Sequence, residues 1–436
     1  MALLTQGPKG TQDLLPKQTA GWQAVEEVMR SEAAVHGFGE IRTPVFEHTE
    51  LFQRSVGETS DVVQKEMYTF QDKGDRSITL RPEGTAGVVR AMLEHALYND
   101  GLPLKFYYFT SCYRYEKPQA GRLREFHQFG VEMFGPAAPI ADAQVICLGK
   151  SIFDRLGVKN LSLQINSIGC PTCRAEYHKA LKAYFEKYKD QLCETCLSRL
   201  DRNPMRILDC KSPVCSKIAD GAPSMLEYLC GDCKEHFEGV KTYLQAAGVE
   251  FTVNPTIVRG LDYYTRTVFE FVSTDLGSQS TVLGGGRYDG LVEEMGGKPM
   301  PGLGFALGIE RLMMILDAQK IELPEAPKCE LFIAALGGEA QARAFQMVTE
   351  LQTYSIFADC DNCSRSLKAQ MKYADKIGAK YTLVLGGDEL EQGQASLKNM
   401  STKEQETVNI NDDFPGQFLA ATAKMEGFGA GGGIGG

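Results

Sequence analysis

The chain has 436 residues, a length that predicts two or three domains, and its 43% hydrophobic and 23% charged residues are typical of globular enzymes with large cores. No stretch approaches the roughly 20 apolar residues of a membrane span, and the first residues lack the layout of a signal peptide, so we expect a cytoplasmic protein without a membrane partner. The net charge of −10 argues against a general nucleic-acid coating protein, DNA-binding ones included, because phosphate binding needs clustered lysine and arginine, although it leaves room for a local basic surface.

The N-terminal segment is predicted to form a helix followed by a short strand. Apolar residues recur at helical spacing in Trp22–His36, and Gly37–Gly39 ends that pattern. Ile41–Phe46 has the composition of a strand, and Pro44 confines it to a sheet edge or a bulge, since proline cannot donate to a ladder. Such an element suits a sheet edge or a subunit interface, with a plain surface strand as the alternative.

A first hairpin is predicted from Met67–Phe70 and Ser77–Leu80, which flank a turn. It leads into Arg81-Pro-Glu-Gly-Thr85 and then a helix over Ala86–His95. Glu83 therefore stands just before a helix begins. Its carboxylate either complements the positive end of that helix or receives an ammonium group of a substrate.

A second hairpin pairs a strand at Phe106–Thr110 with one at Glu125–Phe134 across the basic loop Lys117–Arg124. Polar residues interrupt the apolar pattern of these strands at Arg114, Gln128 and Glu132. Structural sheets seldom carry so many polar side chains inside apolar strands. We therefore expect one face of this hairpin to line a polar site, while the loop is either a binding loop or a solvated charged loop.

Thirteen cysteines are many for a chain without a secretory signal, and eight of them form four close pairs: Cys170/Cys173, Cys193/Cys196, Cys210/Cys215 and Cys230/Cys233. The CxxC pairs favour metal or redox chemistry over structural disulfides. The first two pairs fit the spacing of one four-thiolate zinc site, with reduced, buried cysteines as the alternative. Helical spacing dominates the surrounding block, as in Tyr177–Lys189 and Ser224–Leu244.

Residues 258–272 combine a strand with an unusually polar entrance. Tyr264–Val272 alternates well enough for a strand with two different faces. The entrance, Arg259–Tyr263, joins a cation, a flexible glycine, a carboxylate and a phenol. A core would have to satisfy each of these polar groups, whereas a pocket for a polar substrate needs that mixture. Shortly afterwards, the glycines of Gly284–Asp289 allow the backbone to lie close against a ligand.

Beyond a linker at Glu322–Lys328, the pattern is βαβαβ with two further strands. The expected elements are a strand at Leu331–Leu336, a helix near Ala340–Leu351, a strand at Ser355–Ala358, a helix at Arg365–Ile377, and strands at Tyr381–Leu385, Ala395–Met400 and Thr407–Ile410. The second helix carries a basic stripe, suited to an RNA backbone or simply to solvent, made of Arg365, Lys368, Lys372 and Lys376. Gly427–Gly436 is rich in glycine, and we expect it to be disordered.

Three segments resemble the signature motifs of the class II aminoacyl-tRNA synthetases. Gly39–Phe46 resembles motif 1, the second hairpin with Arg114, Glu116 and Phe126 resembles motif 2, and Gly302–Arg311 resembles motif 3. Within that class, the set Arg81–Thr85, Arg259–Tyr264 and Gly284–Asp289 resembles the histidyl-tRNA synthetase family. Motif 2 alone is a weak signal, but the set in this order is highly specific and covers nearly the whole chain.

The resemblance implies an α+β catalytic domain built on an antiparallel sheet over residues 1–325, with a helical insertion at 168–248 that touches the tRNA acceptor stem. It implies a C-terminal α/β anticodon-binding domain with a mixed sheet at 326–424 and leaves a Gly-rich tail at 425–436. The implied protein is a homodimer and a histidine–tRNA ligase. Such an enzyme makes histidyl-adenylate and pyrophosphate from histidine and ATP with Mg²⁺, and then esterifies the terminal adenosine of tRNA(His).

The resemblance also implies roles for individual residues. Arg114 and Arg259 would be catalytic, because a fixed guanidinium stabilises phosphoryl charge without exchanging a proton. Histidine would be bound by Glu83, Gly84, Thr85, Gln128, Glu132, Tyr263, Tyr264 and Tyr288. ATP would be bound by Arg114, Glu116, Phe126 and Arg311, and the acceptor end of the tRNA by Gln119, Arg122 and Arg124. The family's activity requires no metal in the cysteine block, so a structural zinc there stays open.

Two other functions are weighed against this one. The first is a catalytically silent paralogue, the histidine-sensing regulatory subunit of ATP phosphoribosyltransferase, which lacks the anticodon-binding domain and departs from the pattern around Arg259. The second is a non-enzymatic RNA-binding module. The complete set of ATP-binding arginines speaks against the second, and the intact Arg259 stretch with the C-terminal domain speaks against the first.

Overall fold

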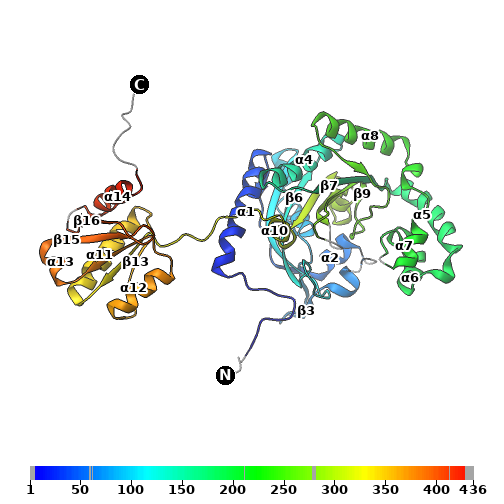
Figure 1. The fold of residues 1–436 in the computed structure, drawn as a ribbon. Helices are drawn as coiled ribbons and strands as arrows, with labels where there is room; N and C mark the ends of the chain where they lie inside the picture. Colours follow the sequence, from blue (N-terminus) through cyan, green and yellow to red (C-terminus); the bar gives the residue numbers. More distant parts are fainter. Residues whose placement is uncertain are drawn as a thin grey trace. The chain divides into compact units, whose positions relative to one another are not determined.

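The computed structural model describes residues 5–57, 60, 62–210, 212–276, 281–411 and 413–427. The chain divides into two compact units, Met1–Pro324 and Glu325–Gly436, and each is described by itself (Figure 1). The Gly-rich tail that the sequence predicts to be disordered lies outside the described residues from position 428 onward.

The first unit contains one large sheet, one small sheet and the helices that cover them. Its strands are β1 Gly39–Glu40, β2 Phe46–His48, β3 Thr69–Gln71, β4 Ser77–Leu80, β5 Leu104–Tyr113, β6 Glu125–Phe134, β7 Leu161–Ser167, β8 Thr252–Val253, β9 Thr265–Ser273, β10 Thr281–Arg287 and β11 Gly302–Gly308. Its helices are α1 Pro16–Val35, α2 Thr49–Val56, α3 Thr85–Glu94, α4 Pro139–Arg155, α5 Pro171–Glu186, α6 Glu194–Arg202, α7 Pro213–Ala219, α8 Gly231–Ala246, α9 Leu291–Glu294 and α10 Ile309–Ala318. Short helical turns include η1 Val62–Glu66, η2 Leu97–Asp100, η3 Lys189–Gln191, η4 Pro204–Ile207 and η5 Met225–Tyr228.

The large sheet has the strand order β1-β5-β6-β11-β10-β9-β7-β8. The six central strands pair antiparallel, and only the two short outermost strands, β1 and β8, pair parallel with their neighbours. The small sheet, β2-β4-β3, contains the first predicted hairpin. The predicted antiparallel catalytic sheet is therefore confirmed.

Strand β6 shows how the two faces of the sheet are divided. Phe129, Val131 and Met133 are buried in the core that also contains side chains of α1, α4, α8 and α10. The residues between them point to the other face because successive side chains of a strand alternate, and these are Gln128, Gly130 and Glu132. One face of the sheet thus forms a core with helices, and the opposite face is left for a site.

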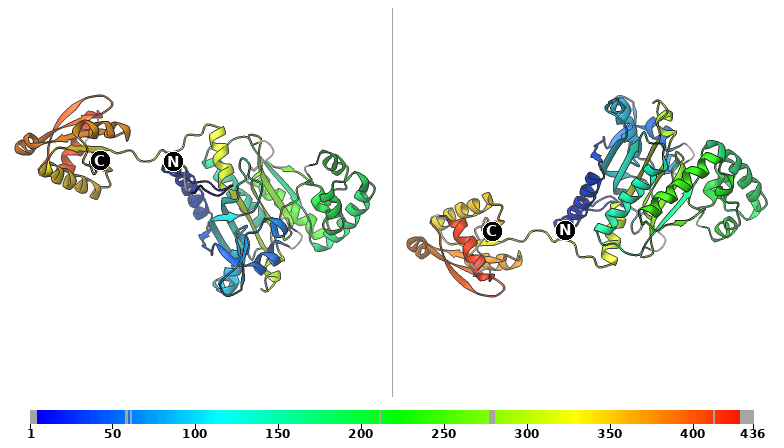
Figure 2. Two further views of the ribbon diagram at one scale, coloured as in Figure 1. Left: turned by 90° about the horizontal axis from the view of Figure 1, so that it is seen from below. Right: turned by 90° about the horizontal axis from the view of Figure 1, so that it is seen from above.

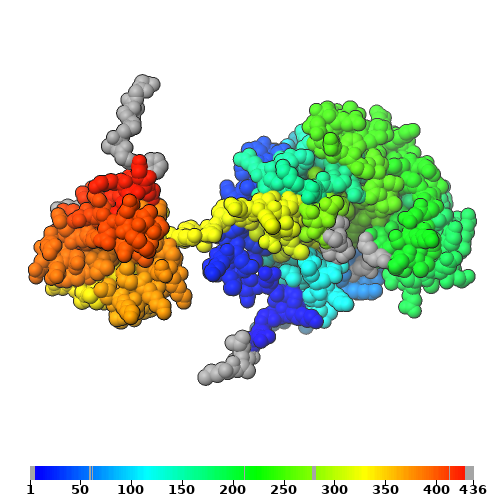
Figure 3. Space-filling model, in the orientation of Figure 1, coloured from blue at the N-terminus to red at the C-terminus, as the bar shows by residue number. Residues whose placement is uncertain are grey.

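The block between β7 and β8 is the helical insertion. Helices α5, α6 and α7 gather at one end of the unit, while α8 returns along the sheet and packs against α4 (Figures 1 and 2). In the space-filling view the insertion forms a lobe continuous with the rest of the unit (Figure 3). The two predicted helical segments are confirmed in outline, although the second divides into η5 and α8.

Two predicted strands are wrong in position. The prediction at Ile41–Phe46 is replaced by two short strands on either side of Pro44. The carbonyls of Thr43 and Pro44 leave the ladder and accept hydrogen bonds from the Arg81 guanidinium, at 2.9 and 3.1 Å. The strand expected at Ser355–Ala358 begins only at Ala358, because Ser355 adopts a left-handed φ of 61° where the preceding helix ends.

The second unit is a mixed sheet with helices on both faces. Its elements are β12 Leu331–Ala335, α11 Gly338–Thr353, β13 Ala358–Cys360, α12 Leu367–Lys376, β14 Tyr381–Leu385, α13 Gly387–Gln392, β15 Gln394–Asn399, β16 Gln405–Asn409 and α14 Phe414–Met425. The order is β13-β12-β14-β15-β16, with the first three strands parallel and the last two antiparallel. Helices α11 and α14, the second of which the sequence did not predict, share a core on one face, and α12 packs on the other. Within the described ranges, no helix has both the length and the apolar character that crossing a membrane requires.

Candidate active site

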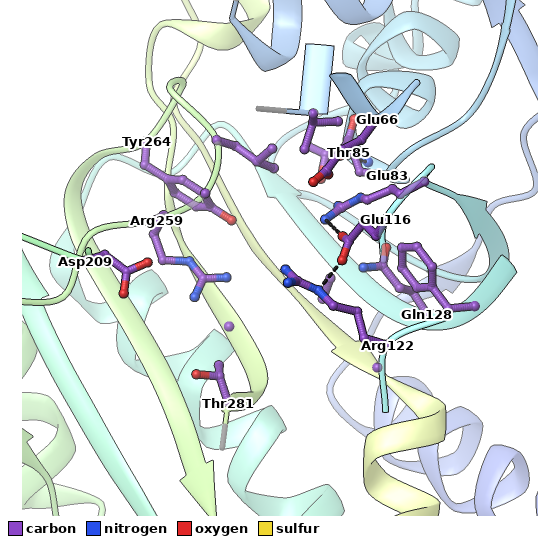
Figure 4. Close-up of a pocket in the computed structure, with 18 of the residues that line it drawn as sticks. Glu66, Glu83, Thr85, Glu116, Arg122, Gln128, Asp209, Arg259, Tyr264 and Thr281 are labelled. Atoms are coloured by element: carbon purple, nitrogen blue, oxygen red, sulfur yellow. Dashed lines mark hydrogen bonds and ion pairs between the residues drawn. The ribbon is translucent and has the colours of Figure 1, made fainter. Parts of the chain in front are cut away.

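A cavity of about 670 Å³ opens on the free face of the large sheet (Figure 4). Most of the residues proposed from the sequence line it: Glu83, Thr85, Arg114, Glu116, Arg122, Phe126, Gln128, Glu132, Arg259, Tyr263, Tyr264, Tyr288 and Arg311. These residues come from segments up to 228 positions apart, between Glu83 and Arg311. Gly84, Gln119 and Arg124 are not part of the lining.

Glu132 is the most deeply buried acidic group among the described residues that line the cavity. It is 1% exposed and accepts hydrogen bonds from the hydroxyls of Thr85 (2.7 Å), Tyr108 (3.0 Å) and Tyr288. Burial raises its pKa to about 8, and the three hydroxyl donors only partly oppose that rise. At neutral pH the group is mainly a protonated carboxyl that is able to give its proton to a basic ligand.

Tyr108 is a site residue that sequence reasoning missed. Its hydroxyl donates to Glu132, and its ring lies so close to Gly84 that a Cβ there would stand 2.3 Å from the ring atom Cε2. Gly84 is therefore required to make room for Tyr108 rather than to line the cavity itself. Tyr108 lies on β5 with the same parity as Arg114, which follows that strand, but its acceptor Glu132 lies on β6, so spacing along β5 alone did not identify it.

Glu83 stands at the start of a helix and also lines the cavity. Its carboxylate accepts hydrogen bonds from the backbone N–H groups of Thr85 (2.8 Å) and Ala86 (2.9 Å), at the start of α3. Burial raises its pKa against the effect of these two amides. The side chain also lines the cavity, so the remaining lone pairs of a carboxylate held at a helix N-terminus face a ligand.

Three tyrosines form the wall beside Glu132. The ring of Tyr263 lies 4.7 Å from that of Tyr264 and 5.4 Å from that of Tyr288, measured between centroids. Burial raises the pKa of all three phenols, so their hydroxyls stay protonated and are available as donors. Gln128 adds an amide to the same surface, where its Oε1 accepts from the Cys112 thiol at 3.3 Å.

Arg259 is the cation beside Tyr264 in the cavity wall. It forms an ion pair with Glu270 and lies 5.8 Å from the centroid of Tyr264. Thr281 donates to the other oxygen of Glu270 at 2.9 Å. A Cβ at Gly284 would stand 2.3 Å from the Arg259 guanidinium, so this glycine leaves the space in which the cation sits. Glu270 was not proposed from the sequence as a site residue, although alternation along the predicted strand puts it on the same side as Tyr264.

Arg114 and Arg311 provide further positive charge. The Nε of Arg114 donates to the carbonyl of Pro82 at 2.8 Å, and its guanidinium lies 5.3 Å from the ring centroid of Phe126. Arg311 donates to the carbonyls of Gly121 (3.2 Å) and Thr281 (2.6 Å). Burial lowers the pKa of Arg311, and Arg122 adds to that effect. The backbone carbonyls thus hold both guanidinium groups in the cavity wall.

The loop after β5 is folded toward the cavity. Arg122 pairs with Glu116, and its side chain and that of Arg259 enter the cavity from opposite sides (Figure 4). Arg124 instead stacks at 3.8 Å on the ring of Tyr115, and Gln119 forms an isolated bridge with Arg122. Of the three residues proposed for tRNA, only Arg122 therefore reaches the cavity.

This cavity thus combines groups that suit a polar ring and an ammonium group with cations that suit phosphates. A model of the family described as "Histidyl-tRNA synthetase" matches residues 10–208 and 215–312, and one described as "Anticodon binding domain" matches residues 330–414. The chain belongs to the histidyl-tRNA synthetase family.

Individual relatives agree with this family. A histidine–tRNA ligase of Acetivibrio thermocellus is 56% identical over 94% of this chain and 98% of its own length. The histidine–tRNA ligase of Clostridioides difficile is 51% identical, again over 94% of this chain and 98% of its own length. The solved structure of apo S. aureus histidyl-tRNA synthetase has a TM-score of 0.80 at 40% identity and covers 95% of this chain and 100% of that one. The fold predicted for both units is therefore the fold of the family.

The silent-paralogue alternative is not favoured. A Bacillus halodurans structure titled as an ATP phosphoribosyltransferase regulatory subunit/histidyl-tRNA synthetase is similar in fold, with a TM-score of 0.62 at 21% identity over 85% of this chain and 97% of that one. The ligases are far more similar in sequence over almost the full length. In this synthetase-family chain, the C-terminal unit and the Arg259 stretch are both present.

The insertion also contributes to the cavity wall, which the sequence did not predict. Arg206 donates to the carbonyl of Gly260 and lies 3.8 Å from Asp262, and Asn203 donates to Asp262 at 3.2 Å. These contacts hold the loop that carries Arg259. They connect an element inserted after β7 to the entrance of β9.

The cysteine pairing expected from spacing is wrong. Cys170 and Cys173 gather with Cys230 and Cys233, which we call the outer cluster. The inner cluster consists of Cys193, Cys196, Cys210 and Cys215. The first CxxC pair is separated from the second because α8 returns to the point where the insertion leaves β7. This return brings the last pair, Cys230 and Cys233, beside the first.

Proposed function

We propose that this protein is a histidine–tRNA ligase that activates histidine with ATP and then transfers it to the terminal adenosine of tRNA(His). The observation that carries the proposal is the combination of two kinds of group in one cavity. A buried carboxyl group, Glu132, and the cations Arg114, Arg259 and Arg311 all line it. Histidyl-adenylate needs both, because it joins an imidazole-bearing amino acid to a phosphate.

We assign histidine recognition to Glu132 and the polar side chains of the same cavity. Glu132 and the Tyr264 hydroxyl offer an acidic and a phenolic partner to the two imidazole nitrogens, and Glu83, Thr85 and Gln128 offer acceptors to the ammonium group. Tyr263 and Tyr288, which pack edge to face on each other, would form part of the wall beside the ring. A buried site built on such partners rejects apolar analogues, since these would leave its polar groups unpaired.

Activation is assigned to the arginines. The histidine carboxylate attacks the α-phosphate of ATP and pyrophosphate leaves, so both reactants are negative and the transition state needs fixed positive charge. We assign Arg259 and Arg114 to the reacting carboxylate and α-phosphate. Both are held before the substrates arrive, Arg259 by Glu270 and Arg114 by the Pro82 carbonyl, so little reorganisation is needed during the reaction.

We assign ATP to the remaining cations and the aromatic ring of the lining. The adenine would stack on Phe126, and Arg311 would hold the outer phosphates, with Glu116 nearby. Mg²⁺ bound to ATP would neutralise part of the phosphate charge. The oxygen donors that this ion prefers are present in the wall as Glu116 and Glu310.

The tRNA contacts are assigned to two regions. Gln119, Arg122 and Arg124 would meet the acceptor end, which requires Arg122 to release Glu116. On α12, Lys368, Lys372 and Lys376 are exposed and form the basic stripe proposed for the anticodon side. We assign catalysis to residues 1–325, acceptor-stem contact to the insertion at 168–248, and anticodon binding to 326–424.

The proposal includes a cytoplasmic homodimer. Val45 and Phe46, in the segment that resembles motif 1, are 41% and 56% exposed although both are apolar. Such a surface is suited to a second copy of the chain. Light scattering coupled to size exclusion tests this, with twice the 48.0 kDa of one chain expected.

Histidine-dependent exchange of pyrophosphate into ATP tests the reaction itself. Exchange by the folded wild-type chain is expected, and its absence would remove the proposed function. Arg259→His should lower the exchange rate about 100-fold or more, as loss of one transition-state donor does, while histidine binding by calorimetry weakens far less. Arg155→His, at a side chain that is 61% exposed on α4, is the matched control. Equal losses of rate and binding at position 259 would contradict its transition-state role.

A further inference from the structure

The outer and inner cysteine clusters have the spacing of metal ligands. Within each cluster the four sulfur atoms lie within 4.8 Å of one another. The sulfurs of Cys170 and Cys173 are 3.5 Å apart, and those of Cys193 and Cys210 are 3.9 Å apart. Disulfide sulfurs stand about 2.05 Å apart, whereas four thiolates around a tetrahedral zinc at about 2.3 Å stand roughly 3.8 Å from one another. The observed sulfur–sulfur distances are therefore those of metal ligands and not those of disulfides.

The local backbone also suits thiolate ligands. Cys170, Cys193 and Cys230 are the N-cap residues of α5, α6 and α8, and each is followed by a second cysteine in the first helical turn. The positive end of a helix stabilises a thiolate. Moreover, the backbone N–H of Cys230 donates to the Cys173 sulfur at 3.1 Å, and that of Cys193 donates to the Cys215 sulfur at 3.3 Å. Such contacts orient and neutralise metal ligands.

Metal binding at these clusters would stabilise the short helices of the insertion. Helices α6 and α7 have only nine and seven residues, too few to be stable alone. The clusters are nested in the sequence, with the outer one joining the two ends of the insertion and the inner one closing the segment between them. A small unit of short helices gains its folding free energy from bound metal where its apolar core is insufficient.

The inner cluster borders the active-site cavity. Cys193 and Cys210 line it, and between them in the chain lie Asn203 and Arg206, which hold Asp262 and Gly260. We propose that each cluster binds one Zn²⁺ through four thiolates, and that the inner zinc fixes the part of the insertion that holds the Gly260–Asp262 loop. Both ions are structural, since four protein ligands leave no open coordination position.

Zinc stoichiometry tests the proposal on the full-length chain. Protein purified in reductant without chelator should carry two zinc ions per chain by mass spectrometry of the metal, and should show thirteen free thiols after denaturation. Cys170→Ser/Cys173→Ser and Cys193→Ser/Cys196→Ser should each lose one zinc. The control is Cys360→Ser/Cys363→Ser, a CxxC pair in the second unit that belongs to neither cluster, which should keep both ions. One zinc or fewer in the wild type, or disulfides within the eight cysteines, would overturn the proposal.

Because a serine variant that misfolds also loses zinc, the wild-type chain supplies a second measurement. Replacement of zinc by Co²⁺ should produce thiolate-to-cobalt charge-transfer bands and the intense visible bands of a tetrahedral ion, with saturation at two equivalents. Weak bands of octahedral cobalt, or saturation at one equivalent, would contradict two tetrathiolate sites.

The role of the inner zinc is tested by kinetics, and this arm rests on the proposed function. In pyrophosphate exchange, Cys193→Ser/Cys196→Ser should raise KM for histidine about fivefold to tenfold, which corresponds to the loss of one to two hydrogen bonds to the loop. The control pair should leave KM unchanged. An unchanged KM in a folded variant that lacks one zinc would refute the positioning role. Absence of exchange in the wild type would instead refute the proposed function, while the zinc count decides the metal sites by itself.

Discussion

Replacement of Glu132 by glutamine tests whether this group reads the imidazole of histidine. Glutamine has nearly the same size, and the hydroxyls of Thr85, Tyr108 and Tyr288 that donate to Glu132 are able to accept from an amide, so the fold is retained. The variant loses the group that shares a proton with the ligand. A hydrogen bond to a charged partner contributes about 1.5–3 kcal/mol, and we therefore expect kcat/KM for histidine to fall roughly 10- to 150-fold.

The pH dependence of that loss follows from the raised pKa of Glu132, about 8. Below pH 8 the free carboxyl group holds a proton, and free imidazole is neutral above its ordinary pKa of about 6.5. The two then combine without exchanging a proton with solvent, because the proton passes between them. Above pH 8 the carboxyl group has lost its proton and must regain one on binding. The wild-type advantage over the variant should therefore fall, by up to about tenfold per pH unit.

The assay is histidine-dependent pyrophosphate exchange by both proteins between about pH 6 and 9. The ratio of their kcat/KM values cancels the titration of the histidine ammonium group and of the phosphates. We expect a ratio that is constant below about pH 8 and falls above it. A ratio that rises through pH 8 would mean that ionised Glu132 binds neutral imidazole, and a ratio near one would remove Glu132 from recognition. Either result refutes the reasoning.

Two further predictions concern the supports of the site. Gly84→Ala places a Cβ 2.3 Å from the ring of Tyr108 and should lower the free energy of unfolding by about 1–3 kcal/mol in urea titrations. Gly290→Ala, whose Cβ would meet nothing nearer than 3.9 Å, should change it little, and equal effects would contradict the steric argument. Glu270→Gln removes the charge that holds Arg259 and should lower the exchange kcat about tenfold with a smaller change in KM for histidine. A purely raised KM would show that Glu270 acts in binding instead.

The second hairpin was predictable because its signal is local. Strand β6 runs over Glu125–Phe134, as its alternating pattern indicates, and the polar residues Gln128 and Glu132 lie on the face opposite the core. Alternation within one strand decides which side chains share a face, and it needs no knowledge of the neighbouring strands. The motif residues on this hairpin therefore reached the cavity as expected.

What the sequence did not reveal depends on partners distant in the chain. Glu270 became part of the site because Gly284, on the neighbouring strand, leaves room for Arg259 above it. Tyr108 is a plain aromatic residue in an apolar strand until Glu132, on the facing strand, supplies its acceptor. Neither contact can be predicted from the spacing of residues within one segment, because each depends on how two neighbouring strands are aligned.

The cysteines show the same limit at larger scale. Spacing along the chain paired the nearest CxxC motifs, but the pairing in space follows the path of the insertion. Since α8 packs on α4 beside the sheet, Cys230 returns to the start of α5 and the first pair closes with the last. The two inner pairs then have only each other as partners. A nested arrangement is the natural result when a helical segment leaves a sheet and returns to it at neighbouring strands.

Two arginines that line the cavity are paired with carboxylates before any substrate is bound. Arg259 pairs with Glu270, and Arg122 pairs with Glu116. A largely buried charge without a partner is costly, and in the first pair that charge is Arg259, whereas in the second it is Glu116, since Arg122 is 44% exposed. Contact with the acceptor end of the tRNA must then exchange this carboxylate for a phosphate of the RNA at Arg122, because Glu116 and a phosphate compete for the same guanidinium. Arg259 is different, since Glu270 lies behind it on β9 and Thr281 fixes that carboxylate from the other side. We therefore expect Arg259 to keep Glu270 throughout the reaction and Arg122 to move, so that the first arginine contributes preorganised charge and the second becomes available to the tRNA.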